Sequence, residues 1–262
     1  MTDRGGSGAG AVPLRELDMD GVAAMRAARR AKRPRRSIGR RIAGWLGRLV
    51  FGFVLVSVLL VLLYRFVPPP ITLTMLSDVI AGHGATKNWV ALDRIDPDMP
   101  RAVIAGEDAN FCAHGGFDYK AIAAAALRNA KGGRIRGGST ISQQTAKNVF
   151  LWQNGGFFRK GLEAWFTLLI EGMWGKRRIM EVYLNVAETG IGTYGVDAGA
   201  RRYFKHGATS LTKREAAQIA AVLPLPKKRA GISPRGFTRR YGNSIAARMN
   251  VVRDDGLDGC LR

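Results

Sequence analysis

Two adjacent carboxylates, Glu107 and Asp108, stand in the run GEDANFCAHGGFDYK (106–120), where the hydrophobic pattern of the chain breaks. A general base needs a pKa close to the working pH, and a second carboxylate within a few ångströms raises one of the two pKa values by like-charge repulsion. The pair therefore has the composition of an acid–base site. On these residues alone, two solvated charges at the end of a helix explain the pattern at least as well.

Three later segments carry cations, amides and further carboxylates. The segment GGSTISQQTAKN (137–148) predicts a helix N-terminus, whose free backbone N–H groups suit a phosphate together with Lys147. RKGLE (159–163) places two cations beside Glu163, and KRRIMEVYLN (176–185) adds further cations and an amide. Clustered cations beside a carboxylate favour chemistry at a phosphate-bearing leaving group.

Other catalytic patterns are weak or missing from the sequence. GIGTYG (190–195) fits the dinucleotide pattern GxGxxG, but a helical pattern precedes it where a strand is needed, so its glycines predict a turn. His83, His114 and His206 are scattered, and neither cysteine has a partner at metal-binding spacing. No GxSxG motif for a serine nucleophile occurs. The sequence thus argues against nucleotide binding, a protein-ligated metal centre and serine catalysis.

The elements that position these segments read as helices joined by turns. Pro97 and Pro100 flank the start of a helix that runs toward Glu107, and Asp118 is a predicted N-cap for the next helix. The glycine-rich segment 131–138 predicts a mobile basic loop. Because no long alternating strand pattern occurs, an all-α or strongly helical α+β fold is expected.

Two capping boxes and one apolar stripe mark the later helices. The capping boxes pair Thr140 with Gln143 and Thr212 with Glu215. The stripe recurs at helical spacing and predicts a core face made of Leu162, Trp165, Phe166, Leu169, Ile170 and Met173. Glu163 lies off that stripe, on a separate face of the same helix.

The N-terminal region divides into a basic tail and an apolar segment. Residues 1–41 are polar and rich in Arg and Lys, which predicts disorder. The run LVFGFVLVSVLLVLLY (49–64) carries no charge and makes a helix of about 24 Å, which with its apolar flanks crosses a bilayer core of about 30 Å. The basic cluster places the tail in the cytoplasm and the chain after Pro70 outside the inner membrane. The outside domain also carries a positive net charge, which meets phosphate-bearing lipids instead of nucleic acid.

Cys112 and Cys260 are the only cysteines of the chain. An oxidising compartment would permit them to pair, but the sequence leaves their separation in space open. The favoured interpretation is two unpaired thiols, with Cys112 as a small packing residue.

In order and spacing, the four segments resemble the motifs of the peptidoglycan glycosyltransferases of glycosyltransferase family 51, from about Trp89 to Pro226. The resemblance implies a mostly α, lysozyme-like domain, and a chain that ends at Arg262 without room for a transpeptidase domain is similar to the monofunctional members. The expected organisation is a disordered basic cytoplasmic tail at 1–41, a transmembrane anchor at 42–67, a linker at 68–88 and a periplasmic glycosyltransferase domain at 89–262.

The resemblance also implies the reaction, which is polymerisation of lipid II into β-1,4 glycan strands by inverting glycosyl transfer. The growing lipid-linked glycan is the donor, the 4-hydroxyl of lipid II is the acceptor, and undecaprenyl pyrophosphate is released. The partners implied are these lipids and the inner membrane, with cell-division or cell-wall synthesis proteins as further candidates and no nucleic acid. Two alternatives stay open: a glycan-cleaving muramidase or lytic transglycosylase, and an inactive membrane-anchored cell-wall scaffold.

Residue roles follow from the same resemblance. Glu107 is the base for the acceptor hydroxyl, Asp108 tunes or orients it, and Glu163 positions a cation against the donor pyrophosphate. That cation is either a basic side chain or a divalent metal, Mg²⁺ or Mn²⁺. The residues assigned to substrate binding besides Asp108 are Phe111, Ser139, Gln143, Lys147, Asn148, Arg159 and Lys160.

Some assignments keep a structural alternative. Phe111 and His114 serve equally well as supports of the loop that presents Glu107, and Glu181 and Asn185 are read as helix-packing groups. Many members of the family carry an arginine four residues before the RK motif, where this chain has Gly155. The pyrophosphate contact of that arginine is then either missing here or supplied by Arg134 or Arg136 of the glycine-rich segment.

Overall fold

The computed structural model describes residues 21–26, 38–130, 138–153 and 155–262, and the chain divides into two compact units, 1–53 and 54–262, each described by itself. The predicted mobile loop at 131–138, with Arg134 and Arg136, lies outside the described residues except for its last glycine. Most of the predicted disordered tail lies outside them too. Where that tail is described, residues 21–26 are helical and the apolar helix already begins at Ile38.

The apolar helix is α2 (Ile38–Phe66), and within the described residues it is the one helix long and apolar enough to cross a membrane. Nearly all of its large apolar side chains are exposed, and only Ser57 and Val61 are buried. Those two residues contact the domain, since the indole N–H of Trp165 donates to Ser57 Oγ (3.1 Å) and that of Trp174 to the Val61 carbonyl (2.7 Å). The end of the apolar helix is therefore fixed by two tryptophans.

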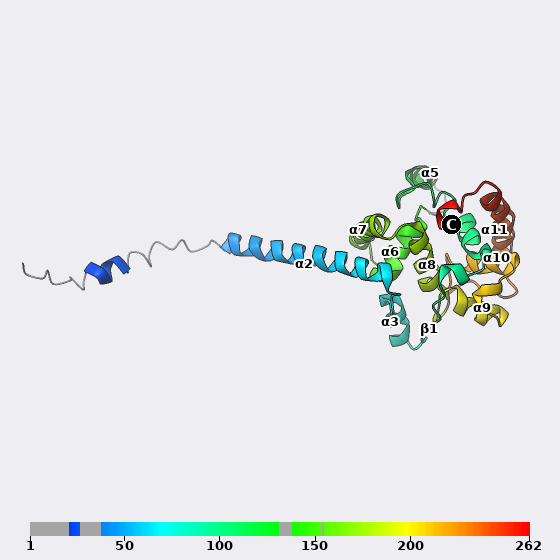
Figure 1. Cartoon of the computed structure of the whole chain (residues 1–262), viewed down its shortest axis with the longest axis horizontal. Coiled ribbons are helices and arrows are strands. Elements are labelled where there is room, and N and C mark those ends of the chain that lie inside the picture. The colour runs from blue at the N-terminus through cyan, green and yellow to red at the C-terminus, as the bar shows by residue number, and fades with distance from the viewer. Residues whose placement is uncertain (1–20, 27–37, 131–137, 154) are drawn as a thin grey trace, which may run out of the picture. The chain divides into compact units, whose positions relative to one another are not determined.

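The domain after the anchor is mostly helical, as predicted (Figure 1). Its α-helices are α3 (Leu73–Ile80), α4 (Asp98–Glu107), α5 (Tyr119–Ala130), α6 (Ile141–Phe150), α7 (Phe157–Met173), α8 (Lys176–Val186), α9 (Val196–Phe204), α10 (Lys213–Val222) and α11 (Gly236–Asp254). Short 3₁₀ turns occur at η1 (Leu92–Arg94), η2 (Ala208–Ser210) and η3 (Gly259–Leu261). Both predicted capping boxes form, at the N-termini of α6 and α10, and Asp118 accepts from the Ala121 N–H at the start of α5.

A small sheet in the described residues joins β1 (Thr86–Lys87), β2 (Glu188–Gly190) and β3 (Thr193–Tyr194) in the order β1-β3-β2. β1 runs parallel to β3, and β2 runs antiparallel to it. The glycines of GIGTYG shape the β2–β3 turn, because Gly192 has φ +62° and a Cβ there would lie 2.3 Å from the His83 carbonyl oxygen. The sequence-based interpretation of this motif as a turn is confirmed.

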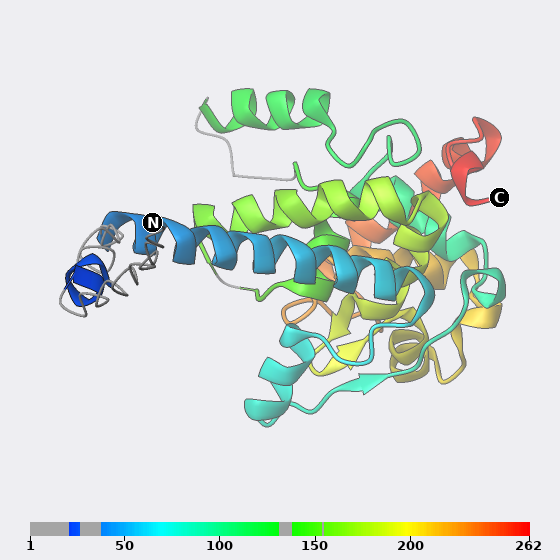
Figure 2. The same cartoon turned by 60° about the vertical axis from the view of Figure 1, so that its left-hand side comes forward.

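Helix α8 lies at the centre of the core, in contact with α6, α7 and α9. Its residues Ile179, Met180 and Leu184 are fully buried. Helices α4, α10 and α11 pack against one another as a second group, and α5 lies at the edge of the domain in both views (Figures 1 and 2). The two groups bring the end of α4 close to α6 and α7, which carry the motif side chains.

Helix α7 is buried more widely than its apolar stripe predicts. Phe166 and Ile170 of the stripe are buried, and its other members are half-buried against the core. The face that carries Glu163 and Thr167 is buried as well, with exposed fractions of 2% and 0%. A carboxylate can be buried there because adjacent cations pair with it.

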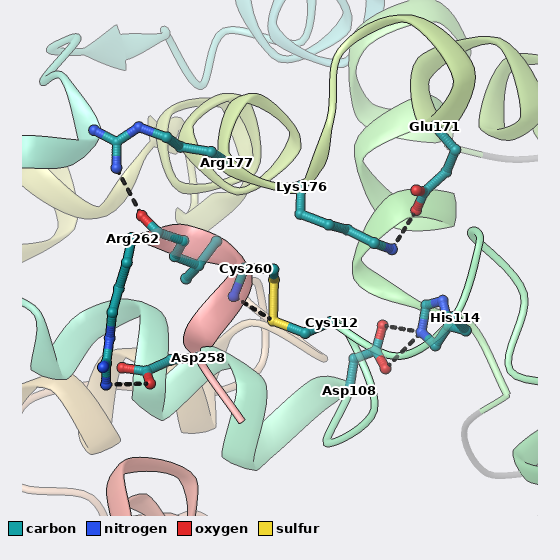
Figure 3. The surroundings of a disulfide bond; sticks show 10 residues. Asp108, Cys112, His114, Glu171, Lys176, Arg177, Asp258, Cys260 and Arg262 are labelled. Carbon is teal, nitrogen blue, oxygen red and sulfur yellow. Dashed lines mark hydrogen bonds and ion pairs between the residues drawn. A yellow bond between two sulfur atoms is a disulfide. The ribbon is translucent and has the colours of Figure 1, made fainter. Parts of the chain in front are cut away.

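The interpretation of the two cysteines as unpaired is wrong. Cys112 and Cys260 form a disulfide across 148 residues of sequence, with their Cα atoms 5.5 Å apart (Figure 3). The C-terminal segment is also held by an ion pair between Arg101 and Asp258 (2.9 Å) and by a hydrogen bond from Arg177 to the Leu261 carbonyl (2.7 Å). The bond ties the loop after Glu107 to the end of the chain, a contact that sequence spacing does not indicate.

Candidate active site

One cavity of about 410 Å³ is lined by both Glu107 and Glu163. Glu107 is the last residue of α4, and Glu163 lies in the second turn of α7. The remaining lining residues come from α4, from α6, from α11 and from the connections that precede α6 and α11: Gly106, Ser139, Gln144, Lys147, Pro224, Arg229, Phe237 and Tyr241. The two motif glutamates, 56 positions apart in the sequence, thus share a single site.

Glu107 has one direct hydrogen-bond donor, the Gln144 amide, at 2.9 Å from Oε2. Burial raises the pKa of Glu107, while the Gln144 hydrogen bond and the charges of Arg229 and Lys147 oppose the rise. Repulsion from Asp108 is the weakest of these influences on the pKa. The pKa of Glu107 is thus raised, as the sequence argument expects, but mainly by desolvation and not by the neighbouring carboxylate.

Asp108 is turned away from this cavity and braces the loop. Its carboxylate accepts a hydrogen bond from the Ile141 N–H (3.0 Å) and lies 3.0 Å from His114 Nε2 (Figure 3). The residue is only 7% exposed. Asp108 is not among the residues that line the cavity, and its position fits the orienting role that links the Glu107 loop to α6, while its assignment to substrate binding stays a prediction.

Several backbone N–H groups at the N-terminus of α6, which the sequence suggests are free, already have partners within the protein. The Ile141 N–H is bound to Asp108, the Gln143 N–H to Thr140 Oγ1 (3.2 Å), and the Thr140 N–H to the Gln143 side chain (3.0 Å). Gln143 is therefore occupied by the capping box and is 4% exposed. Its assignment to substrate binding stays a prediction, and the capping box gives this side chain a structural role instead.

Glu163 is surrounded by cations. Arg159 Nη1 lies 2.7 Å from one carboxylate oxygen, and Lys160 pairs with the other. Lys160 also lies 3.3 Å from the Ser139 hydroxyl, which lines the cavity. Arg159, Lys160 and Ser139 are thus gathered on the Glu163 side, as the sequence-based assignments require.

Lys147 stands between the two glutamates. Burial lowers the pKa of Lys147, attraction to Glu163 and to Glu107 opposes that change, and repulsion from Arg159 and Lys160 reinforces it. A further anion that enters the cavity would stabilise the charged form of this ammonium group. Lys147 therefore suits a phosphate group, in agreement with its assignment from the sequence.

Gly155 fills a position where a side chain would not fit. Its φ is +147°, and a Cβ would lie 2.8 Å from Trp152 Nε1 and 3.1 Å from Arg159 Cβ. Arg159 folds over this glycine and donates from Nε to its carbonyl (3.1 Å). This chain therefore has no arginine side chain at position 155. Instead, the backbone carbonyl of Gly155 helps to hold Arg159 in its position beside Glu163.

Two further assignments change in the structure. Phe111 is fully buried, with Lys176 Nζ 4.6 Å from its ring centroid, so its loop-supporting role replaces the proposed substrate contact. Asn148 is 9% exposed and faces a neighbouring cavity of about 380 Å³, which shares Lys147 with the first. Glu181 and Asn185 bind backbone N–H groups at Leu92 and Val90, which fits the packing roles expected for them.

Besides Gly106 and Pro224, sequence reasoning missed four lining residues, Gln144, Arg229, Phe237 and Tyr241. Gln144 could have been found, since it stands one helical turn before Lys147 in the same motif. Arg229, Phe237 and Tyr241 carry no such signal, because they lie more than a hundred positions after Glu107 and reach it only through the packing of α10 and α11 on α4.

The residues described here do not fit a divalent metal. In the described parts of the chain, no group of three or more His, Cys, Asp or Glu side chains is placed to hold one. Glu163, the carboxylate assigned to that role, has both oxygens engaged by Arg159 and Lys160. Basic side chains therefore supply the positive charge at this site.

Comparisons with known proteins agree with the geometry and with the mostly α, lysozyme-like fold. The family model described as Transglycosylase matches residues 74–252. A biosynthetic peptidoglycan transglycosylase of Caulobacter vibrioides is 48% identical over 228 residues, covering 86% of this chain and all of the relative. Proteins of the same name from Rhodospirillum centenum and Jannaschia sp. are 46% and 42% identical, over 82% and 89% of this chain and 94% and 99% of their own. The chain belongs to the transglycosylase family.

Proposed function

We propose that this enzyme polymerises lipid II into β-1,4-linked glycan strands by inverting glycosyl transfer, with release of undecaprenyl pyrophosphate. One observation carries the proposal: a single cavity holds a half-buried carboxylate at Glu107, bound by the Gln144 amide, and a cation-bearing carboxylate at Glu163. A base on one side and positive charge on the other are what transfer to an alcohol with an anionic leaving group requires.

In the proposed step, the Glu107 carboxylate accepts the proton of the acceptor 4-hydroxyl. The hydroxyl oxygen attacks C1 of the donor sugar from the face opposite the pyrophosphate, so the new bond is β when the broken bond was α. The C1–O bond electrons leave with the pyrophosphate. Gln144, which donates to Oε2 of Glu107 at 2.9 Å, holds the carboxylate in place for this transfer.

The leaving group is stabilised from the Glu163 side. Lys147 lines the cavity, and Lys160 bridges Glu163 and Ser139 at its wall. Glu163 keeps Arg159 and Lys160 in fixed positions, so that their charges are already oriented when the pyrophosphate anion develops. No divalent metal is needed for this step.

The proposed location is the inner membrane, with the N-terminus in the cytoplasm and the domain in the periplasm. Support comes from the apolar α2, from the basic residues that precede it, and from a disulfide that is stable in an oxidising compartment. A tether of this kind raises the effective concentration of substrates whose lipid tails stay in the bilayer.

The test is polymerisation by the full chain in lipid vesicles supplied with lipid II. We expect long glycan that lysozyme digests, no change on adding a chelator, and inhibition by the phosphoglycolipid moenomycin. Release of soluble muropeptides from lipid-free peptidoglycan would instead identify a glycan-cleaving enzyme. Failure to bind lipid II and moenomycin would leave a scaffold role in place of the proposed enzyme.

A further inference from the structure

Arg229 belongs to none of the four motif segments, yet it lines the cavity beside Glu107. It lies in the connection between α10 and α11, where its Nη1 donates to the Ala221 carbonyl (2.7 Å). Its guanidinium carbon lies 5.1 Å from the ring centroid of Phe237 and 5.7 Å from that of Tyr241. A planar cation held on two aromatic faces and one carbonyl has little rotamer freedom.

The same aromatic pair connects Arg229 to the backbone of the base. The Tyr241 hydroxyl donates to the carbonyl of Gly106 (2.7 Å), the residue directly before Glu107. Phe237 stacks on Tyr241 with ring centroids 5.7 Å apart. One wall of the cavity therefore fixes both the guanidinium and the end of α4.

The charged and titratable groups around Glu107 come from every element packed against it. They are Lys147 of α6, Asp108 of the following loop, Tyr183 of α8, Tyr241 of α11, Glu163 of α7 and Arg229 of the connection. Burial raises the pKa of both tyrosines, so they are neutral at pH 7. Among the described residues, the positive charges that lower the pKa of Glu107 are then those of Lys147 and Arg229.

These two cations differ in what they can do for the base. Lys147 is attracted to both glutamates, and burial lowers its pKa. A phosphate in the cavity would engage it further. An arginine stays charged at every working pH, and Arg229 is held on the wall that contacts Gly106.

We propose that Arg229 is a positioning residue for the general base: its fixed charge offsets the burial of Glu107 and keeps that carboxylate ionised and oriented toward the acceptor hydroxyl. The inference rests on the proposed function, because it requires Glu107 to accept a proton. It adds a residue outside the family motifs to the machinery of the reaction.

The consequence is a defined pH dependence. Both burial and the loss of a nearby cation raise the pKa of a carboxyl group. Replacing Arg229 with a neutral residue therefore lowers the ionised fraction of Glu107 at neutral pH. The ascending limb of the rate profile moves to higher pH, and a displacement of about one pH unit lowers the rate on that limb about tenfold.

The experiment compares kcat between pH 5.5 and 9 for the full chain and for Arg229→Gln and Arg229→Lys, with lipid II at saturation. We expect the ascending limb of Arg229→Gln to shift upward, so that activity is low at pH 6.5 and recovers toward pH 9. Arg229→Lys should keep the wild-type limb because it keeps the charge. Arg239→Gln, which removes an exposed arginine of α11 outside the cavity lining, is the control for net charge and should leave the profile unchanged.

An unshifted limb in Arg229→Gln, or an equal loss at every pH, would overturn the inference. If Arg229→Gln is too unstable to assay, a displaced limb in Arg229→Lys would overturn it instead. Wild-type chain that does not polymerise lipid II at any pH would contradict the proposed function itself, so the two failures are distinguishable.

Discussion

Glu107 and Glu163 line the same cavity but have opposite surroundings. Glu107 has an uncharged amide, Gln144, as its close partner, and burial raises its pKa. Glu163 is 2% exposed and has one cation on each carboxylate oxygen. The two carboxylates of one cavity therefore suit different roles because their partners differ, one able to accept a proton and the other committed to holding cations.

The two sites are also assembled in different ways. Arg159 and Lys160 precede Glu163 by four and three positions on one helix, so their pairing is set within α7. The surroundings of Glu107 come from α6, from α11 and from the connection before α11. The Glu163 side is thus a local arrangement, whereas the Glu107 side depends on the tertiary fold.

The largest effect is expected from Glu107→Gln, because the amide cannot accept the acceptor proton. We expect kcat to fall by about 10²- to 10⁴-fold, the usual contribution of a general base, while lipid II still binds. Steady-state polymerisation and moenomycin binding measure the two quantities separately.

Glu163→Gln is the matched variant on the other side of the comparison. It releases Arg159 and Lys160, so both kcat and moenomycin affinity should fall. A Glu107→Gln enzyme with near wild-type kcat, or a Glu163→Gln enzyme with unchanged moenomycin affinity, would contradict the division of roles.

The same contrast explains what the sequence could predict. Helix caps such as Thr140 with Gln143, and the cations next to Glu163, follow from spacing along one helix. Spacing could not show that Phe111 is fully buried or that Arg229 reaches Glu107, since both depend on how distant helices pack. It also could not show how near Cys112 lies to a cysteine 148 positions away.

The second prediction concerns the disulfide, which braces the Glu107 side alone. Its Cys112 lies in the loop where Asp108 binds α6, and Asp258, two positions before Cys260, pairs with Arg101 of α4. Reduction, or replacement of both cysteines with serine, should lower the free energy of unfolding by about 2–4 kcal/mol. Thermal unfolding with and without reductant measures the effect.

The activity readout separates the two sides of the cavity. Loss of the disulfide should lower kcat more than moenomycin affinity, since the cations around Glu163 are held within α7. The double-serine variant is the control, because added reductant should not change its melting temperature. Equal melting temperatures for the oxidised and reduced wild type would show that the bond does not stabilise the fold.

The smallest effect is expected at a third glutamate, Glu188, which is not among the residues that line the cavity of Glu107 and Glu163. It tests how burial changes the pKa of a carboxyl group that has no proposed catalytic role. It lines the neighbouring cavity, and its side chain is 9% exposed. Within the described residues, Oε1 has no hydrogen-bond partner, and Lys227 Nζ forms an ion pair with it at 3.7 Å. Burial raises the pKa of Glu188 to about 7. Since the folded chain binds this proton more tightly than the unfolded chain, the group favours folding at low pH, and that contribution is lost as the pH rises through about 7.

Glu188→Gln removes this dependence. The variant should match the wild type in melting temperature near pH 5 and exceed it by a few degrees at pH 8. The dependence of kcat on pH, which we attribute to Glu107, should be the same in both. Parallel melting curves across that range would show that burial alone does not set the pKa of Glu188. The raised pKa of Glu107 would then have to be explained by the particular residues that line its cavity. The different behaviour of Glu107 and Glu163 would likewise follow from those lining residues and not from desolvation.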